Sequence, residues 1–289
     1  DDTRALFPRA LGDDLFRPQS KAADGRRSDQ RCLVPAFLRK SAQNGTQPGP
    51  GVVVSGHRGG AIFPHAVRSL RLAPGERAQI LVDLSEGRPL RLIASSPANA
   101  MGMMGGQGGG MMGGGMMGNR TGRERQGRTF SILDMRPSGS STPVMLPPTL
   151  AALAAPDPSL AVRSRRFVLD MGMMGRGMSI NGQTMDMDVI NQRVPVGQWE
   201  IWEIANASMM AHPFHIHNVQ FRLLDRDGRP PQAEEAGFKD TVIVNPREQV
   251  RLLLRFEENT DPDNPYMYHC HILEHEDAGM MGQFVVTAN

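Results

Sequence analysis

Six of the eight histidines fall in two short windows, and this clustering constrains the fold more than any other feature of the chain. The first window, His212-Pro-Phe-His-Ile-His217, holds three of them, and the second, His269-Cys-His271 followed by His275, holds the other three. Side chains alternate between the two faces of a β-strand, so histidines separated by one residue share a face. Two strands that carry these windows and lie side by side would gather four imidazoles on one side of a sheet.

The opposite side of the same strand carries a cysteine. Cys270 lies between two histidines and points away from them, where His212, His275 and Met280 can join it. A soft thiolate, two imidazoles and a weak axial thioether are the ligands of blue-copper electron-transfer sites. Zinc is the rival metal, but it favours closed tetrahedral sites built from paired spacings. If the histidines were ordinary core or surface residues, six of the eight would have to fall in two windows by chance. The sequence thus predicts two metal sites connected by one strand.

Short stretches of alternating and β-branched residues, separated by Gly, Pro, Asn and Asp, recur from about residue 52 onward. This pattern indicates many short strands, and no segment shows a long helical period. The regular spacing favours an all-β fold of antiparallel β-sandwiches. The predicted strands are Val52–Ser55, Ala78–Leu84, Leu90–Ala94, Thr129–Met135, Arg166–Met171, Trp199–Asn206, Phe214–Leu224, Thr241–Val244, Val250–Glu257, Tyr266–His269 and Gln283–Thr287.

An internal repeat predicts two copies of one domain type. Pro74–Leu84 aligns with Pro246–Phe256, with the proline, the glutamate two residues later and the apolar alternation in register. A chain of 289 residues also has the length of about two domains. We expect a first domain over residues 1–150, irregular or incomplete at its start, and a second over 160–289. The Pro-, Ala- and Ser-rich segment Thr142–Leu160 is the predicted linker.

Composition excludes several classes of function. The 32 basic and 30 acidic residues nearly cancel, and the basic ones form no stripe, so we expect no nucleic-acid partner. No run of eighteen apolar residues is present, so we expect no membrane span. The two cysteines, Cys32 and Cys270, indicate no disulfide framework. The chain starts at Asp1 without a charged and apolar leader, so we expect a signal peptide to be absent or removed.

Methionine occurs 20 times and is concentrated in two runs. Residues 101–118 contain seven Met, ten Gly and one Gln, a composition that cannot bury a core and predicts a mobile loop. The second run, Met171–Met187, carries six Met with aspartates interleaved. Scattered methionine usually fills gaps in a core, but a thioether in a Gly-rich loop has no core to fill. Because thioether sulfur is a soft ligand, the loop is predicted to trap Cu(I).

Both histidine windows resemble the C-terminal signatures of multicopper oxidases, the family of laccases and bacterial cuprous oxidases. Every position of H-P-x-H-x-H and of H-C-H-x₃-H-x₄-M is filled. The resemblance covers the chain from about residue 160 to its end, and Val52–Leu84 is similar to the family's middle domain. It implies cupredoxin-like Greek-key β-sandwiches. The ligands that it implies are His212, Cys270, His275 and Met280 for type 1 copper, His215 for type 2 copper, and His217, His269 and His271 for the type 3 pair.

The resemblance also implies the chemistry. An electron from a reductant enters at type 1 copper, passes through Cys270 and its bonded neighbours His269 and His271, and reaches the trinuclear cluster, where dioxygen is reduced to water. Glu276 matches a glutamate that the family uses as a proton donor, and a plain surface carboxylate is the alternative. We therefore expect these four residues to carry catalysis, with copper as the cofactor and dioxygen as the co-substrate.

Within the family, His275–Met281 and the Met-rich insertion are most similar to the periplasmic cuprous oxidases of copper tolerance. In those enzymes a substrate Cu(I) is held near type 1 copper by Met and Asp. Met210 matches the family's methionine, whereas Ser208 stands where aspartate is expected, so Asp170 and Met171 are candidates for the other ligands. The implied reductant is Cu(I) or a small organic molecule, and the implied location is periplasmic or secreted.

The chain departs from the family in its number of histidines. A complete enzyme has ten copper-binding histidines, four of them in two H-x-H pairs of an N-terminal domain. Here six are present, and the two others, His57 and His65, belong to no such pair. The other ligands are expected from a missing N-terminal domain or a second polypeptide. One alternative is a copper-binding or electron-transfer cupredoxin that sequesters Cu(I) without oxidase activity. Another is a laccase for bulky phenols, which methionines near type 1 copper disfavour.

Overall fold

The computed structural model describes residues 36–42, 51–54, 65–67, 69–82, 84, 87, 89–95, 129–139, 154–172, 177–257, 260–261 and 263–288. All of them lie in one compact unit, Cys32–Asn289. The Met/Gly-rich segment 101–118 and His57 lie outside the described residues, as do Cys32 and the first part of the predicted linker. No helix among the described residues has the length and apolar character needed to span a membrane.

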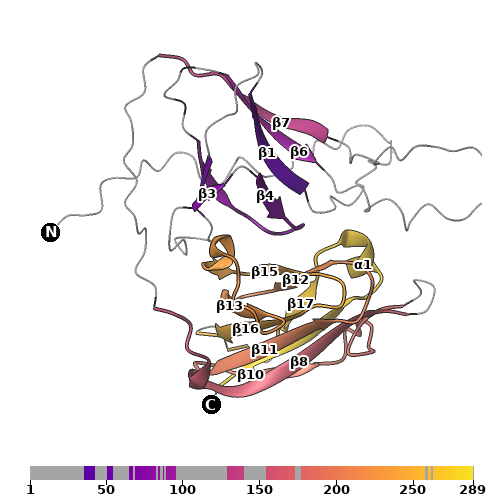
Figure 1. Ribbon diagram of the computed structural model, residues 1–289. Helices are drawn as coiled ribbons and strands as arrows, with labels where there is room; N and C mark the ends of the chain where they lie inside the picture. The colour runs from indigo at the N-terminus through magenta and orange to yellow at the C-terminus, as the bar shows by residue number, and fades with distance from the viewer. Residues whose placement is uncertain are drawn as a thin grey trace, which may run out of the picture. The chain divides into compact units, whose positions relative to one another are not determined.

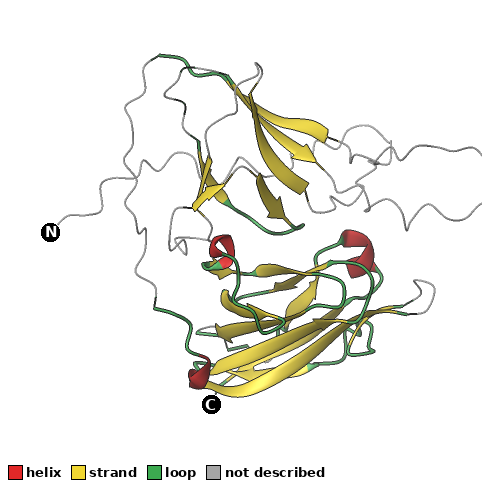
Figure 2. Ribbon diagram, viewed as in Figure 1, coloured by secondary structure: helices red, strands yellow, loops and turns green. Residues whose placement is uncertain are grey.

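The C-terminal strands form a β-sandwich of two sheets, shown in Figures 1 and 2. The six-stranded sheet has the order β14-β13-β16-β11-β8-β9 and consists of β8 (Ala161–Met171), β9 (Met178–Ile180), β11 (Trp199–Asn206), β13 (Phe221–Arg226), β14 (Phe238–Lys239) and β16 (Gln249–Arg255). The five-stranded sheet has the order β10-β18-β17-β12-β15 and consists of β10 (Gln192–Pro195), β12 (His212–Ile216), β15 (Thr241–Val244), β17 (Tyr266–Cys270) and β18 (Met281–Thr287).

Within the described residues, three short helical segments connect these strands. The α-helix α1 (Leu273–Asp277) joins β17 to β18. The 3₁₀ turn η2 (Pro158–Leu160) leads into β8, and η4 (Ala233–Glu235) lies between β13 and β14. Because α1 follows β17 after only two residues, it keeps its own side chains close to the end of that strand.

Strands β12 and β17 are antiparallel neighbours, and their register fixes the relation of the two histidine windows. Phe214 pairs with Cys270, and His215 pairs with His269. On its other edge β12 pairs with β15, where His212 lies opposite Val244. The two windows therefore lie side by side, which is the arrangement that brings imidazoles from both strands to one face of the sheet.

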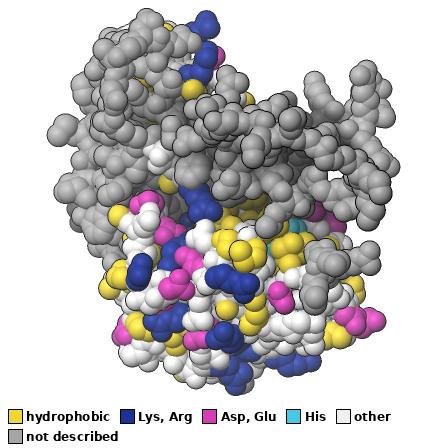
Figure 3. Space-filling view, turned by 45° about the vertical axis from the view of Figure 1, so that its right-hand side comes forward, with side chains coloured by type: hydrophobic (Ala, Val, Ile, Leu, Met, Phe, Trp, Pro, Cys, Tyr) yellow, Lys and Arg dark blue, Asp and Glu magenta, His cyan; other side chains and the backbone are white. Residues whose placement is uncertain are grey.

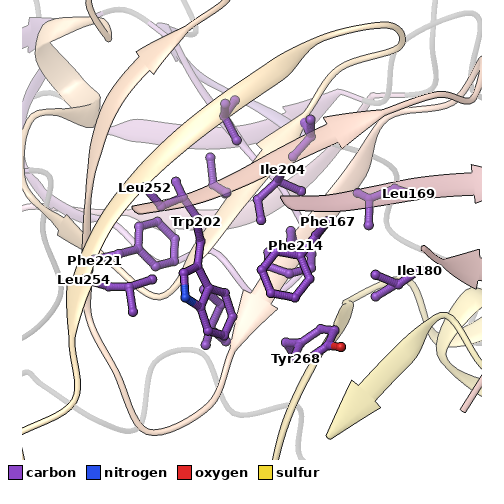
Figure 4. Close-up of a cluster of buried hydrophobic side chains, with 14 of the residues drawn as sticks. Phe167, Leu169, Ile180, Trp202, Ile204, Phe214, Phe221, Leu252, Leu254 and Tyr268 are labelled. Carbon is purple, nitrogen blue, oxygen red and sulfur yellow. The ribbon is translucent and has the colours of Figure 1, made fainter. Parts of the chain in front are cut away.

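The core between the two sheets is aromatic at its centre (Figure 4). Strand β11 alternates in burial along its whole length, as expected for a strand with one face against a core. Its fully buried Trp202 packs against Phe167 of β8, with ring centroids 4.6 Å apart, and against Tyr268 of β17, 5.9 Å apart. Since Tyr268 is two residues from Cys270, the aromatic core holds the strand that carries the cysteine.

The described N-terminal strands form two smaller sheets. The four-stranded sheet, in the order β4-β1-β6-β7, consists of β1 (Ala36–Ala42), β4 (Ser69–Leu72), β6 (Leu90–Ser95) and β7 (Thr129–Met135). The three-stranded sheet, in the order β3-β2-β5, consists of β2 (Gly51–Val54), β3 (His65–Val67) and β5 (Gln79–Leu81). The core described here is small and centres on Leu92 and Ala94. The predicted domain boundaries at 150 and 160 stay predictions.

The all-β fold class predicted from the sequence is confirmed, with two corrections. Strand β8 pairs in parallel with β11, and β10 with β18, so both large sheets are mixed rather than antiparallel. The single strand predicted over Phe214–Leu224 is wrong, because the segment forms β12 and β13 in different sheets. Asn218 lies between them with a φ of 57°, a left-handed backbone that reverses the chain and that asparagine tolerates.

Candidate metal centre

The first group of ligand atoms comes from the start of β12, the end of β17 and helix α1. The Cys270 Sγ atom lies 3.5 Å from Nδ1 of His212 and 3.5 Å from Nδ1 of His275. The two Nδ1 atoms are 3.2 Å apart, and all three side chains are fully buried. A thiol sulfur and two ring nitrogens therefore face one another where bulk water is excluded, a geometry that suits a single metal ion.

The chain turns back after α1 and sets Met280 beside this first group. Gly279, with a φ of 89°, ends the helix, and the Met280 N–H donates to the His275 carbonyl at 2.9 Å. The Cys270 N–H in turn donates to the Met280 carbonyl at 3.0 Å. Met280 is fully buried within the main core. Met280 would therefore supply a weak thioether ligand to a copper ion held by the first group.

The second group lies on the other face of β17. The Nε2 atoms of His217 and His269 are 3.2 Å apart, and one ligand atom each of His215, His217 and His269 lies within 4.8 Å of the others. Nδ1 of His215 is 2.9 Å from both the Asp240 carbonyl and Thr241 Oγ1. Because these partners hold Nδ1, Nε2 is left as the ligand atom of His215.

One stretch of backbone joins the two groups. Cys270 of the first group is bonded to His269 of the second and to His271. The ring centroid of His271 lies 5.5 Å from that of His215 and 5.3 Å from that of His269, so it borders the second group without being one of its three members. Among the described residues, these are the two places where three or more metal-binding side chains converge.

Burial keeps the histidines of both groups uncharged at neutral pH. It lowers the pKa of His212 to about 3, with a further lowering by His275. Burial also lowers the pKa of His215 to about 4, although Asp240 opposes the shift. The pKa values of His217, His269 and His275 are lowered for the same main reason. A neutral imidazole is the form that binds a metal, so these residues need lose no proton to do so near pH 7.

The lowered pKa values predict that the metal-free protein loses stability as the pH falls below 6.5. Between pH 6.5 and about 4 the unfolded chain binds protons that folded His212 and His215 do not, so the free energy of unfolding falls. His212 alone should contribute a loss that approaches about 1.4 kcal/mol per pH unit well below pH 6.5. Urea denaturation at pH 7, 6 and 5 measures this slope, which His212→Gln should reduce. A constant free energy of unfolding across that range would contradict the prediction.

The donor atoms of the first group fit copper. Thiolate sulfur with two imidazole nitrogens and a nearby methionine is a set that soft or borderline copper prefers. Nε2 of His275 is buried and has no hydrogen-bond partner, which is costly for an imidazole held only by packing. A metal bond at Nδ1 of the same ring would offset that cost. In the view of Figure 3 only a small area of histidine reaches the surface, bordered by hydrophobic side chains.

Glu276, the predicted proton donor, lies at the edge of the second group. Its Oε2 atom is 3.4 Å from Nδ1 of His269, and its side chain is 30% exposed. The carboxylate therefore stands between a candidate metal ligand and solvent. The family resemblance identifies this glutamate from the sequence, whereas its contact with His269 depends on how α1 packs against β17.

The residues predicted to hold a substrate copper come from adjacent segments. The loop before β12 carries half-buried Met210, and the Ala207 N–H donates to the Leu169 carbonyl at 2.9 Å. Exposed Asp170 and half-buried Met171 follow directly at the end of β8. These segments lie at the same end of the sandwich as the first group, because the loop also contacts His212.

Sequence reasoning missed three polar groups that hold the histidines in place. Ser208 Oγ lies 2.8 Å from Nε2 of His212. The Asp240 carbonyl and the Thr241 hydroxyl hold His215. No local pattern identifies such partners, because the contacts depend on a loop conformation and on the register of β12 against β15. The family motif marks only the ligands themselves.

Comparison with known proteins places these features in a family. A family model described as multicopper oxidase matches residues 159–289. The Staphylococcus aureus protein named multicopper oxidase mco is 43% identical over 118 residues, which are 39% of this chain and 26% of that protein. The cell division protein FtsP of Photorhabdus laumondii is 33% identical over 224 residues, 77% of this chain and 43% of that protein. The chain thus matches less than half the length of either relative.

A solved structure extends the likeness to the fold. The bacterial laccase-like multicopper oxidase CueO of Ochrobactrum sp. aligns with a TM-score of 0.68 at 31% identity, over 88% of this chain and 53% of that one. The cupredoxin-like fold implied by the histidine windows is thereby confirmed, and copper is the cofactor of the family. Residues 159–289 therefore form a domain of the multicopper oxidase family.

Proposed function

We propose that this chain forms the part of a multicopper oxidase that takes electrons from a reductant and passes them toward dioxygen. The observation that carries the proposal is the backbone connection between the two groups, since Cys270 of the first lies between His269 and His271. Copper bound at the two groups would supply one-electron redox chemistry and dioxygen reduction. Four one-electron oxidations of the reductant and four protons convert one dioxygen to two waters.

The proposal gives each ligand one role. We assign type 1 copper to His212, Cys270, His275 and Met280, type 2 copper to His215, and the type 3 pair to His217, His269 and His271. Cys270 is then both a ligand and the start of a covalent path to two ligands of the other site. Buried packing around the first group and the anchored Nδ1 of His215 fix the ligand geometry before any metal binds.

We assign proton delivery to Glu276. Its carboxylate contacts His269 and reaches solvent, so it can take a proton from water and hold it beside the second group. The alternative, a surface carboxylate without a role in the reaction, predicts that Glu276→Gln leaves turnover unchanged. Proton delivery predicts that this variant slows dioxygen reduction, whereas the copper content and the rate at which the reductant would reduce copper at the first group stay unchanged.

We propose Cu(I) as the reductant because the end of the sandwich around the first group is acidic and rich in methionine. Three segments surround the first group at this end, 169–192, 206–211 and 272–281. Their described residues include no Lys or Arg. The carboxylates in those segments are Asp170, Asp186, Asp188, Glu274, Glu276 and Asp277. Such a surface attracts cations, and thioether sulfur selects Cu(I) among them. Met210, Asp170 and Met171 are the proposed ligands, and the loop 101–118 is the proposed trap that feeds them.

Removing one thioether tests this choice of reductant. Met210→Leu keeps the size and apolar character of the side chain, so we expect it to lower kcat/KM for Cu(I) by about tenfold. Turnover of an organic reductant such as a small phenol should stay within twofold, because that molecule needs no sulfur ligand. Met135→Leu in β7, remote in sequence, is the matched control. Equal losses for both reductants would contradict a Cu(I) site at Met210.

The proposal of oxidase activity has a rival, copper sequestration without dioxygen reduction. The six histidines of the two windows favour this rival for the chain taken alone, and it is also supported by the likeness to FtsP, a relative named as a cell division protein rather than as an oxidase. An oxygen electrode separates the two. Sustained dioxygen uptake by the full-length natural protein, one molecule for each four Cu(I) oxidised, supports the oxidase. A single stoichiometric burst supports sequestration.

The proposed physiological setting is copper tolerance, outside the cytoplasm. An enzyme that converts Cu(I) to the less thiophilic Cu(II) protects best where external copper arrives first, in the periplasm or beyond the cell. Organic reductants stay as the alternative, since the Ochrobactrum relative is described as an oxidase of lignin model compounds and lignosulfonate.

A further inference from the structure

A buried asparagine next to the first group has a fixed orientation. The Nδ2 atom of Asn206 lies 2.6 Å from the carbonyl oxygen of Met210, 3.0 Å from that of Val244 and 3.0 Å from that of Asn245. Carbonyl oxygens only accept, so the atom that faces them must be the amide nitrogen. The Asn206 side chain is buried, and its Oδ1 atom therefore points in the opposite direction, toward Ser208.

This orientation decides where the proton of the Ser208 hydroxyl points. Asn206 Oδ1 is 2.9 Å from the Ser208 nitrogen and 2.8 Å from Ser208 Oγ. An amide oxygen cannot donate, so the hydroxyl must donate to it. The alternative acceptor, the Met210 carbonyl, is farther from Oγ, at 3.1 Å, and already accepts from the Asn206 amide. The lone pairs of Oγ are then left for the Met210 N–H at 3.2 Å and for His212.

Because its proton points to Asn206, Ser208 Oγ can only accept a hydrogen bond from the imidazole of His212. Nε2 of His212 lies 2.8 Å from Ser208 Oγ, so Nε2 must carry the proton and donate it. A neutral imidazole has one N–H, so Nδ1 is left unprotonated, and it is Nδ1 that faces Cys270 and His275. If Ser208 Oγ instead donated its proton to Nε2 of His212, Oγ and Asn206 Oδ1 would face each other at 2.8 Å with no hydrogen between them.

We propose that Ser208, oriented by Asn206, is a positioning residue that fixes the ring and the tautomer of His212 so that Nδ1 is presented as a metal ligand. The unit is rigid because Val244, one of the carbonyls that orient Asn206, lies opposite His212 in the β12–β15 ladder. Ser208 is only 5% exposed, so water does not replace its hydroxyl without a rearrangement. The inference rests on the proposed function only in taking His212 as a copper ligand.

The first test needs no copper. Nitrogen-15 NMR of the histidine side chains in the metal-free protein distinguishes a protonated from an unprotonated ring nitrogen. We expect His212 to show a protonated Nε2 and an unprotonated Nδ1 as one fixed form. A protonated Nδ1, or rapid averaging of the two forms, would overturn the proposal whether or not the protein is an oxidase.

The second test measures what the hydroxyl contributes to metal binding. Ser208→Ala removes the acceptor and leaves a buried N–H without a partner, and we expect the affinity for Cu(II) at the first group to fall by about 10- to 100-fold. Loss of the hydrogen bond also makes the imidazole a weaker donor to Cu(II), so the reduction potential should rise. Ser208→Thr, which keeps a hydroxyl, should restore both values. Ser164→Ala, at an exposed hydroxyl that contacts Glu203, is the matched control.

The outcomes separate the two proposals. If the wild-type protein binds no Cu(II) at the first group, the proposed function fails, while the NMR result still tests the tautomer. If copper binds but Ser208→Ala leaves the affinity and potential unchanged, the positioning role is overturned. If Ser208→Ala does not fold, Ser208→Thr decides, because a role for the hydroxyl predicts wild-type affinity and potential for that variant. Loss of both in a folded Ser208→Thr protein would count against the role.

Discussion

Replacing Cys270 by serine is expected to abolish the intense blue absorption that Cu(II) loading should give the wild-type protein. The absorption requires a thiolate bonded to Cu(II), and Cys270 is the cysteine whose sulfur lies within 3.5 Å of two ring nitrogens. Serine keeps the size of the side chain and a polar ligand atom, so copper can still bind while the thiolate band disappears. Absorbance and electron paramagnetic resonance after loading with Cu(II) measure the change.

Two control variants show whether the band reports on the first group. His215→Ala alters the second group alone and should leave the blue band in place. Cys32→Ser, at the other cysteine, should also leave it unchanged. An equally intense band in Cys270→Ser would contradict the assignment of Cys270 as the thiolate ligand. Loss of the band in Cys32→Ser would indicate that Cys32 supplies the thiolate instead.

The second large effect is expected from a buried ion pair in the sandwich. The guanidinium of Arg165 in β8 meets the carboxylate of Glu200 in β11 through two contacts, of 2.6 and 2.8 Å. The side chains are 9% and 0% exposed. Trp202 Nε1 donates to the same carboxylate at 3.0 Å. Arg165 also donates to Gln192 of β10, so the pair connects the two sheets of the sandwich.

Arg165→Met should therefore destabilise the metal-free protein by about 3 to 5 kcal/mol, because it leaves a buried carboxylate without its cation. Adding Glu200→Gln removes the uncompensated charge and keeps an acceptor for Trp202, so the double variant should recover much of the loss. Urea denaturation followed by tryptophan fluorescence measures the free energies of unfolding. Arg91→Met, which breaks the exposed pair with Asp134, is the control and should change little. A single variant as stable as the wild type would show that the carboxylate is not buried in solution.

The sequence was sufficient to predict the all-β fold, and it predicted that the two windows converge if their strands lie side by side. The alternation of side chains along a strand requires His269 and Cys270 to point to opposite faces, and the structure pairs His215 with His269 across β12 and β17. Strand β7 has the predicted bounds, Thr129–Met135. These features follow from local periodicity, which is readable in one sequence.

The remaining features depend on tertiary structure, which local patterns do not encode. Strand β1 lies in a polar, Arg-rich stretch and was not predicted, since its pairing with β4 and β6 rather than its own composition defines it. Two strands replace the one predicted over Phe214–Leu224, because apolar residues continue through the turn at Asn218. The role proposed for Ser208 was hidden for a similar reason, as the contact with His212 exists only after Asn206 is fixed by β15.

Diffraction data collected at the copper absorption edge from Cu(II)-loaded crystals would show directly whether the two groups bind copper. We predict one anomalous peak within bonding distance of Cys270 Sγ and the Nδ1 atoms of His212 and His275. We predict further copper at the Nε2 atoms of His217 and His269, on the other face of β17. Copper at surface methionines alone, with Cys270, His212 and His275 still packed against one another without a metal, would contradict this prediction.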